Sequence, residues 1–216
     1  MKKALTTSLL LGATLLPMLQ GCIPLVAVGA TAGTLAAVDR RSLSTQTADE
    51  TIEWKAALQI SELGGRQSHL NFTSYDRKVL ITGEVPSEDL KAEVGRLVAA
   101  IAEVQGVYNE LAVAPPTSLG ERSTDSYITT KVKTRLVDSG KLNAAFVKVV
   151  SEAGVVYLLG LVTQPEADAA IQVARSTGDV KKVVTLLEII SDAKAKELDV
   201  QVESSPPANP ASISGG

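Results

Sequence analysis

The clearest pattern along the chain is a pair of short, largely apolar runs that occurs twice. The runs are Leu70–Thr73, Val79–Val85, Val147–Val150 and Val156–Val162. A polar break separates the two runs of each pair: Tyr75-Asp76-Arg77 in the first copy and Glu152-Ala153-Gly154 in the second. Gly83 and Gly160 stand at matching places, 77 positions apart, and every apolar strand position of one copy falls opposite another. The pattern predicts an internal repeat in which each copy contains a β-hairpin.

Helical patterns surround each hairpin. After the hairpins, apolar residues recur at one-sided helical spacing: Leu90, Val94, Leu97, Val98 and Ile101, then Ala167, Ala170, Ile171 and Ala174. Amphipathic segments precede the hairpins over 51–63 and 126–137, and apolar strands over 104–113 and 180–190 close the copies. Asp125 is a candidate cap for the second amphipathic segment. We therefore predict an α+β fold of two αββαβ units, each with a three-stranded mixed sheet covered on one face by two helices.

Composition divides the chain into segments. Paired prolines at Pro115 and Pro116 predict a linker, and the Ser-, Pro- and Gly-rich end predicts a disordered tail. The predicted segments are a signal peptide at 1–21, an acylated N-terminus and tether at 22–49, a first domain at 50–113, a linker at 114–123, a second domain at 124–190 and a tail at 191–216.

The leader predicts a lipid anchor. Lys2 and Lys3 precede an apolar stretch that ends at Leu19-Gln20-Gly21-Cys22, which resembles a bacterial lipobox. Cys22 is the only cysteine, so it forms no internal disulfide and is the predicted lipidation site. Ile23 follows it, whereas Asp at this place favours the inner membrane of Gram-negative bacteria, so we expect the outer membrane. The alternative is an uncleaved membrane anchor, because no charge occurs from Ala4 to Val38.

Charge and chemistry exclude several classes of function. The net charge is −3 and becomes −5 once Lys2 and Lys3 are removed, which argues against a nucleic-acid binder. His69 is the only histidine and is expected in a solvated loop. We therefore predict no enzyme activity, no catalytic residue, no metal site and no cofactor.

The repeats and their glycines resemble BON domains. The leader, Asp39-Arg40-Arg41-Ser42, Val107-Tyr108-Asn109-Glu110, Leu119-Gly120-Glu121 and Ile128-Thr129-Thr130-Lys131-Val132 further resemble the dual-BON outer-membrane lipoproteins of Gram-negative bacteria. This resemblance extends from Met1 to about Ile190 and leaves the tail unmatched.

The two copies differ in charge. Residues 51–113 carry six Lys/Arg and nine Asp/Glu, whereas residues 124–190 carry eight and seven. In the second copy, basic residues flank an apolar stripe behind an aromatic ring, giving the candidate lipid-binding set Tyr127, Ile128, Lys131, Val132, Lys133, Arg135 and Leu136. The pattern alone favours a helix whose stripe packs on the sheet while its lysines are solvated. The family resemblance instead favours lipid binding, although the family commonly carries Trp where this chain has Tyr127.

The resemblance implies a lipid-anchored outer-membrane protein that faces the periplasm. It would bind anionic phospholipids, phosphatidylglycerol or cardiolipin, through its second domain and support envelope integrity, with a possible role at division sites. The alternative is a periplasmic protein-binding adaptor for outer-membrane assembly or for control of cell-wall hydrolases. Expected partners are these lipids and envelope proteins, and no nucleic acid.

Overall fold

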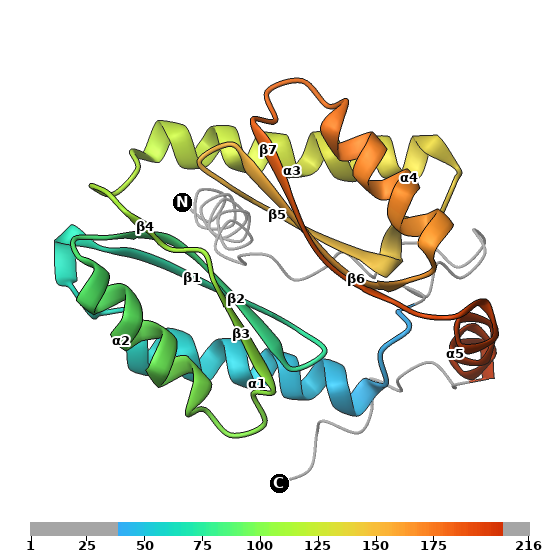
Figure 1. The fold of residues 1–216 in the computed structure, drawn as a ribbon, viewed down its shortest axis with the longest axis horizontal. Coiled ribbons are helices and arrows are strands. Elements are labelled where there is room, and N and C mark those ends of the chain that lie inside the picture. Colours follow the sequence, from blue (N-terminus) through green and yellow to red (C-terminus); the bar gives the residue numbers. More distant parts are fainter. Residues whose placement is uncertain (1–38, 205–216) are drawn as a thin grey trace, which may run out of the picture. The chain divides into compact units, whose positions relative to one another are not determined.

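The computed structural model describes residues 39–204 (Figure 1). The predicted signal peptide, Cys22 and most of the tether lie outside the described residues, as do residues 205–216. Within residues 39–204, no helix combines the length and the apolar character needed to cross a bilayer.

The first domain contains two helices and one sheet. Its main elements are α1 (Leu43–Ile60), β1 (His69–Tyr75), β2 (Lys78–Val85), α2 (Glu88–Ala99), β3 (Gly106–Asn109) and β4 (Ala112–Val113), with a short 3-10 turn, η2 (Gly65–Gln67). β1 pairs with β2 antiparallel, and β3 and β4 pair with β2 in parallel. The predicted closing strand is thus divided at Glu110 and Leu111, and Leu111 is buried in the core.

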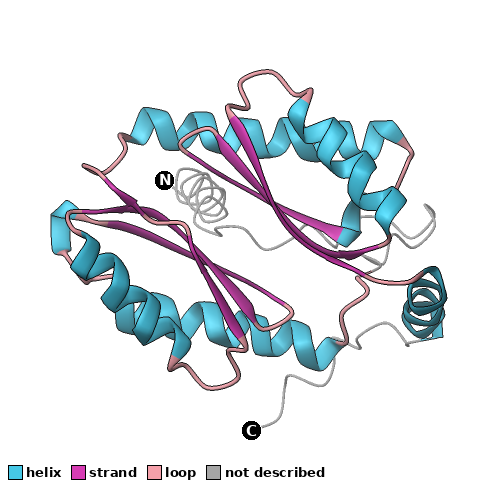
Figure 2. Ribbon diagram, in the orientation of Figure 1, coloured by secondary structure: helices cyan, strands magenta, loops and turns pink. Residues whose placement is uncertain are grey.

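The second domain repeats this order. Its elements are α3 (Leu119–Ser139), η3 (Ala144–Phe146), β5 (Val147–Glu152), β6 (Val155–Val162), α4 (Gln164–Arg175) and β7 (Lys182–Ile189). β5 and β6 are antiparallel, whereas β6 and β7 are parallel. The helices α1 and α2 cover one face of the first sheet, and α3 and α4 cover one face of the second (Figure 2), which confirms the predicted fold class.

Local sequence explains the turns and the helix ends. Both hairpins turn through two residues with positive φ, Asp76-Arg77 and Ala153-Gly154, the conformation that suits the twist of antiparallel strands. The first helix of each domain begins earlier than predicted, at Leu43 rather than Thr51 and at Leu119 rather than Ser126, because Ser42 and Ser118 cap them. Asp125, predicted as a cap, instead lies buried inside α3 and accepts hydrogen bonds from the Ala153 and Gly154 N–H groups.

The predicted disordered tail is wrong in its first part. Residues Asp192–Ser204 form the helix α5. The sequence pattern did not predict this helix because most of its residues are polar. Ala195 is buried, and Asp199 forms an ion pair with Arg40 from the other end of the described chain. These tertiary contacts stabilise a helix whose composition alone indicates solvated chain.

Each domain has its own core between helices and sheet. Ile52, Ala56 and Ile60 of α1 are buried in the first core, and Ile128, Val132 and Leu136 of α3 occupy the matching places in the second, 76 positions later. A third cluster joins the two domains through the opposite sheet faces and contains the buried residues Tyr75, Leu80, Tyr157 and Leu159. The two sheets therefore pack against each other through the faces that carry no helix.

Candidate functional site

The apolar residues of the predicted lipid-binding set face the protein interior. Ile128, Val132 and Leu136 are 1%, 0% and 0% exposed and belong to the core of the second domain. They have no surface to offer a lipid in this conformation, so these three members of the candidate lipid-binding set pack in the core, as the pattern alone favours. Their spacing along α3 serves packing on the sheet.

The opposite face of α3 carries a different apolar set. Leu119, Tyr127 and Val137 are 82%, 60% and 65% exposed. Leu119 and Val137 lie 18 positions apart, about five helical turns, so their side chains leave the helix in the same direction. Leu119 lies ahead of the predicted helical segment 126–137, because the helix starts at Leu119 and not at Ser126. Val137 lies within that segment, but it is not part of the Ile128, Val132 and Leu136 stripe, so the candidate set did not include it.

The basic residues of the set differ in their surroundings. Lys131 Nζ lies 3.0 Å from Asp179 Oδ2 and 5.5 Å from the centre of the Tyr127 ring. Arg135 donates hydrogen bonds to the Ser176 carbonyl and to Thr177 Oγ1. Lys133 is exposed and makes no ion pair with any residue of the described range 39–204. Lys133 and Lys131 therefore lie on either side of the outward apolar face, with only Lys133 fully available to an external anion.

A cavity of about 470 Å³ opens beside the N-terminal half of α3. Ile128 and Val180 contribute apolar walls, and Lys181, Glu121 and Asp179 contribute charges. The Lys181 ammonium donates a hydrogen bond to the Ala153 carbonyl, 3.1 Å away. This cavity therefore adjoins the inward side of α3, and its lining holds three carboxylates, including that of Asp125, against the one ammonium group of Lys181.

The matching helix of the first domain also exposes apolar side chains. Trp54 and Leu58 of α1 are exposed at the places that Thr130 and Thr134 occupy in α3. Glu50 and Glu53 lie beside Trp54 in a cavity of about 440 Å³. This surface combines apolar groups with negative charge, unlike the outward face of α3.

Two consecutive arginines join the segment ahead of α1 to both domains. The Arg40 guanidinium pairs with Glu166 at 2.7 Å and Asp199 at 2.8 Å, donates to the Leu161 carbonyl and stacks on the Phe146 ring. Burial raises the pKa of Glu166, but the hydrogen bonds and charge of Arg40 outweigh it and bring that pKa below its ordinary value.

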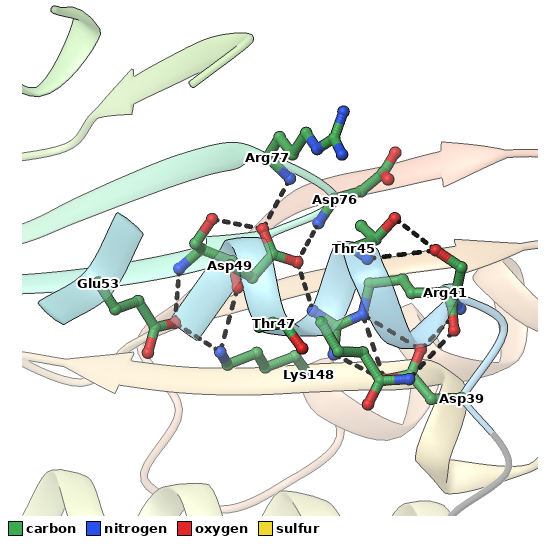
Figure 3. A network of polar contacts seen from close by, with 12 residues as sticks. Asp39, Arg41, Thr45, Thr47, Asp49, Glu53, Asp76, Arg77 and Lys148 are labelled. Atoms are coloured by element: carbon green, nitrogen blue, oxygen red, sulfur yellow. Dashed lines mark hydrogen bonds and ion pairs between the residues drawn. The ribbon is translucent and has the colours of Figure 1, made fainter. Parts of the chain in front are cut away.

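Arg41 binds the first domain (Figure 3). Its guanidinium pairs with Asp39 and Asp49, each at 2.6 Å, and stacks on the Tyr75 ring. Asp49, which is buried, also accepts hydrogen bonds from the Asp76 and Arg77 N–H groups at the hairpin turn. Asp49 thus has the same role in the first domain that Asp125 has in the second.

Further polar contacts cross between the domains. Lys148 Nζ of β5 lies 2.8 Å from Glu53 Oε1 of α1 and also donates to the Ser74 carbonyl (Figure 3). Lys78 of β2 pairs with Glu188 of β7. Burial, followed by the charges of Glu110 and Glu152, raises the pKa of Tyr157 to about 12, so its hydroxyl stays neutral within the sheet-to-sheet contact.

His69 lies at the end of the first sheet that is away from the Asp76-Arg77 turn. Its side chain is mostly buried, so the predicted solvated loop is wrong. It is the first residue of β1 and stands opposite Glu84 of β2. His69 Nδ1 is 3.5 Å from Glu84 Oε2 and 3.7 Å from Glu152 Oε1 of the second domain. Residues 83 positions apart along the chain therefore meet at the domain junction, which no local pattern reveals.

Comparisons with known proteins match this architecture. The family model of the BON domain matches residues 49–115 and 124–191. The chain is 39% identical to Outer membrane lipoprotein DolP of Haemophilus influenzae over 185 residues, which cover 85% of this chain and 95% of that protein. It is 34% identical to a protein named 21 kDa hemolysin of Actinobacillus pleuropneumoniae, covering 71% of this chain and 80% of the relative. The chain therefore belongs to the BON-domain family, as a two-domain member of the group of outer membrane lipoproteins that includes DolP.

Proposed function

We propose that this protein is anchored in the outer membrane through acylated Cys22, faces the periplasm, and binds anionic phospholipid through the outward face of α3. The single observation that carries the lipid proposal is the outward apolar set of Leu119, Tyr127 and Val137 beside Lys133, which pairs with no carboxylate of residues 39–204. Such a helix inserts apolar groups among acyl chains while its cations stay among headgroups. Phosphatidylglycerol and cardiolipin supply the required negative charge, and the bound protein would support envelope integrity, including at division sites.

The charge difference between the domains supports this choice. The first domain has three more acidic than basic residues over 51–113, so an anionic surface repels it, whereas the second has one more basic than acidic residue over 124–190. Near an anionic membrane each lysine contributes about 1 kcal/mol, within a Debye length of roughly 8–10 Å. Lys133 contributes without breaking an ion pair in the described part of the chain, whereas Lys131 must exchange Asp179 for a headgroup.

Vesicle co-sedimentation tests the lipid proposal. The soluble chain from Asp39 onward should bind phosphatidylglycerol vesicles, bind phosphatidylcholine vesicles poorly, and lose binding as salt rises. Lys133→Glu should remove most of the binding, and Tyr127→Ala should weaken it at every salt concentration. Lys55→Glu on α1, at the place that Lys131 occupies in α3, is the charge-reversal control in the first domain and should change little. Equal binding to both kinds of vesicle, or full binding by Lys133→Glu, would refute the proposal.

A second candidate function is that of a protein-binding adaptor. The exposed Trp54 and Leu58 beside Glu50 form an apolar surface with acidic neighbours, which suits a basic, partly apolar protein partner rather than an anionic membrane. Outer-membrane assembly factors and regulators of cell-wall hydrolases are the classes of partner we expect. If Trp54→Ala causes the envelope defect of a deletion strain while vesicle binding stays normal, the adaptor function is the physiological one.

A further inference from the structure

Two buried carboxylates and a histidine meet where the two domains join. Glu84 and Glu152 are 3% and 7% exposed, and His69 Nδ1 is enclosed by protein. The three ligand atoms, one from each residue, all lie within 4.8 Å of one another. They come from β1, β2 and β5, so the packing of the two sheets brings them together.

The two carboxylates accept hydrogen bonds from neutral groups, but none of these donors supplies a positive charge. His69 Nδ1 makes no hydrogen bond within the described part of the chain. Its distances of 3.5 and 3.7 Å to the two carboxylates exceed the usual limit of about 3.2 Å for a hydrogen bond from nitrogen. Two neighbouring buried carboxylates also need a positive charge, because an uncompensated buried charge is strongly unfavourable. Among residues 39–204, neither carboxylate pairs with a lysine or an arginine.

The opposite end of the domain junction contains a cation at the place that matches this cluster. Phe146 and Leu161 stand 77 positions after His69 and Glu84, at the matching places of the second domain. There the Arg40 guanidinium fills the corresponding space, stacked 3.8 Å from the centre of the Phe146 ring and 3.0 Å from the Leu161 oxygen. One end of the junction is thus joined by an organic cation, while the other presents an imidazole nitrogen and two carboxylates.

We propose that His69, Glu84 and Glu152 bind a divalent transition-metal ion of the zinc type, which joins the first domain to the second. In a tetrahedral zinc site with ligands at about 2.0–2.2 Å, neighbouring ligand atoms lie roughly 3.3–3.6 Å apart. The separations of 3.5 and 3.7 Å are close to this value, so small side-chain shifts complete the geometry. One imidazole and two carboxylates suit zinc better than magnesium or calcium, which prefer oxygen ligands alone. Water takes the fourth position.

The surroundings orient the ligands and leave an approach open. Asn71 Nδ2 and Thr82 Oγ1 donate to Glu152 Oε2 at 2.7 and 3.1 Å, which directs the other carboxylate oxygen toward His69. The Thr117 N–H donates to Glu84 Oε2 at 3.1 Å. A cavity of about 340 Å³, lined by His69, Glu152 and Arg122 among others, gives an ion access from solvent.

Nuclear magnetic resonance of the unmutated protein gives the most direct test. His69 is the only histidine, so one imidazole spectrum reports the site without ambiguity. The full acylated chain, purified in detergent and treated with a chelator, is titrated with ZnCl₂. Saturation at one ion per chain, with a change in the Nδ1 resonance, supports the proposal. A histidine that responds to pH but not to zinc would mean that a proton alone neutralises the carboxylates, and would overturn it.

Calorimetric zinc titration of variants tests the ligand set. Glu152→Gln should weaken zinc binding at least tenfold and still fold, because its amide oxygen can accept from Asn71 and Thr82 while its NH₂ group faces His69. Glu84→Gln is a second ligand variant with the same expectation. Glu53→Gln is the matched control, since Glu53 also joins the domains, through Lys148, but belongs to no ligand set. Zinc should raise the melting temperature of the wild type and of Glu53→Gln only. Equal zinc affinity in all variants, or equal binding of MgCl₂ by the wild type, would refute the site.

Discussion

Arg40 and Arg41 are neighbours in the chain, and their guanidinium groups bind different domains. Arg40 stacks on Phe146 of the second domain, and Arg41 stacks on Tyr75 of the first. Both groups are held by carboxylates, and burial of Arg40 is almost complete, with 4% exposed. The short segment between the predicted membrane anchor and α1 therefore also connects the two BON domains.

Loss of the Arg40 side chain should destabilise the protein strongly. Arg40→Gln leaves Glu166 and Asp199 without their partner, and removing one member of a buried pair costs about 3–5 kcal/mol. Asp199 is partly exposed, so we expect the lower end of this range. For a chain of this size the melting temperature should fall by roughly 6–12 °C.

The control for this experiment is the exposed pair of Lys194 and Glu197 on α5. Lys194→Gln should change stability by less than about 1 kcal/mol, because solvent screens exposed ion pairs. Similar melting temperatures for Arg40→Gln and Lys194→Gln would show that the Arg40 contacts contribute little.

The same ion pair predicts a dependence on pH. Because Arg40 holds the pKa of Glu166 below its ordinary value, the carboxylate stabilises the folded state above the unfolded pKa of about 4.3. That stability is lost as the pH falls through the lower pKa of the folded state. The difference in melting temperature between the wild type and Arg40→Gln should therefore shrink below about pH 4. A difference that stays constant down to pH 2 would contradict this account.

Local sequence patterns predicted the repeat, the fold class and the hairpins, because these depend on neighbouring residues. Alternation around Asp76-Arg77 and Ala153-Gly154 indicates hairpins, and the period of Ile128, Val132 and Leu136 indicates a helix. The same period could not tell a stripe that packs on a sheet from one that meets lipid, and the structure places it in the core.

Contacts between distant residues could not be predicted in this way. Arg40 and Asp199 are 159 positions apart, and His69 and Glu152 lie in different copies of the repeat. The helix α5 was missed for the same reason, since its ion pair with Arg40 joins residues far apart in the sequence and its composition is mostly polar. The contacts at both ends of the domain junction depend on how the two sheets pack, so the sequence pattern alone could not predict them.

Gly83 should tolerate no side chain, although its neighbours along β2 are ordinary strand residues. Its φ is +114°, and a Cβ there would lie 1.9 Å from the His69 carbonyl oxygen. Gly83→Ala must therefore shift the backbone of β1, at a cost of about 2–4 kcal/mol from strain and overpacking. Chemical denaturation should show this loss.

Gly120 in the first turn of α3 is the matched control, because a Cβ there meets only the Ser118 hydroxyl, at 3.8 Å. Gly120→Ala should stabilise the protein by about 0.4–1 kcal/mol, since alanine restricts the unfolded chain and favours the helix. A Gly83→Ala variant as stable as Gly120→Ala would show that β1 can move away at little cost.

Removal of α5 should lower stability, in contrast to the expectation for a disordered tail. A chain that ends at Ser191 lacks the Asp199 partner of Arg40 and the buried Ala195. We expect its melting temperature to fall by several degrees in thermal unfolding monitored by circular dichroism. Asp199→Asn should reproduce only part of the fall, because Glu166 still pairs with Arg40. An unchanged melting temperature after truncation would show that α5 contributes nothing to the folded state.

The two faces of α3 should separate stability from lipid binding. Ile128 is buried, so Ile128→Val should cost about 0.5–1.5 kcal/mol of stability and leave binding to phosphatidylglycerol vesicles unchanged. Val137 is exposed, so Val137→Ser should change stability by less than about 0.5 kcal/mol. Because each inserted methyl group contributes roughly 0.8 kcal/mol, Val137→Ser should weaken vesicle binding about four- to fifteenfold. If Ile128→Val weakens vesicle binding while Val137→Ser does not, α3 must turn its inner face to the membrane, and the outward face is not the lipid-binding surface.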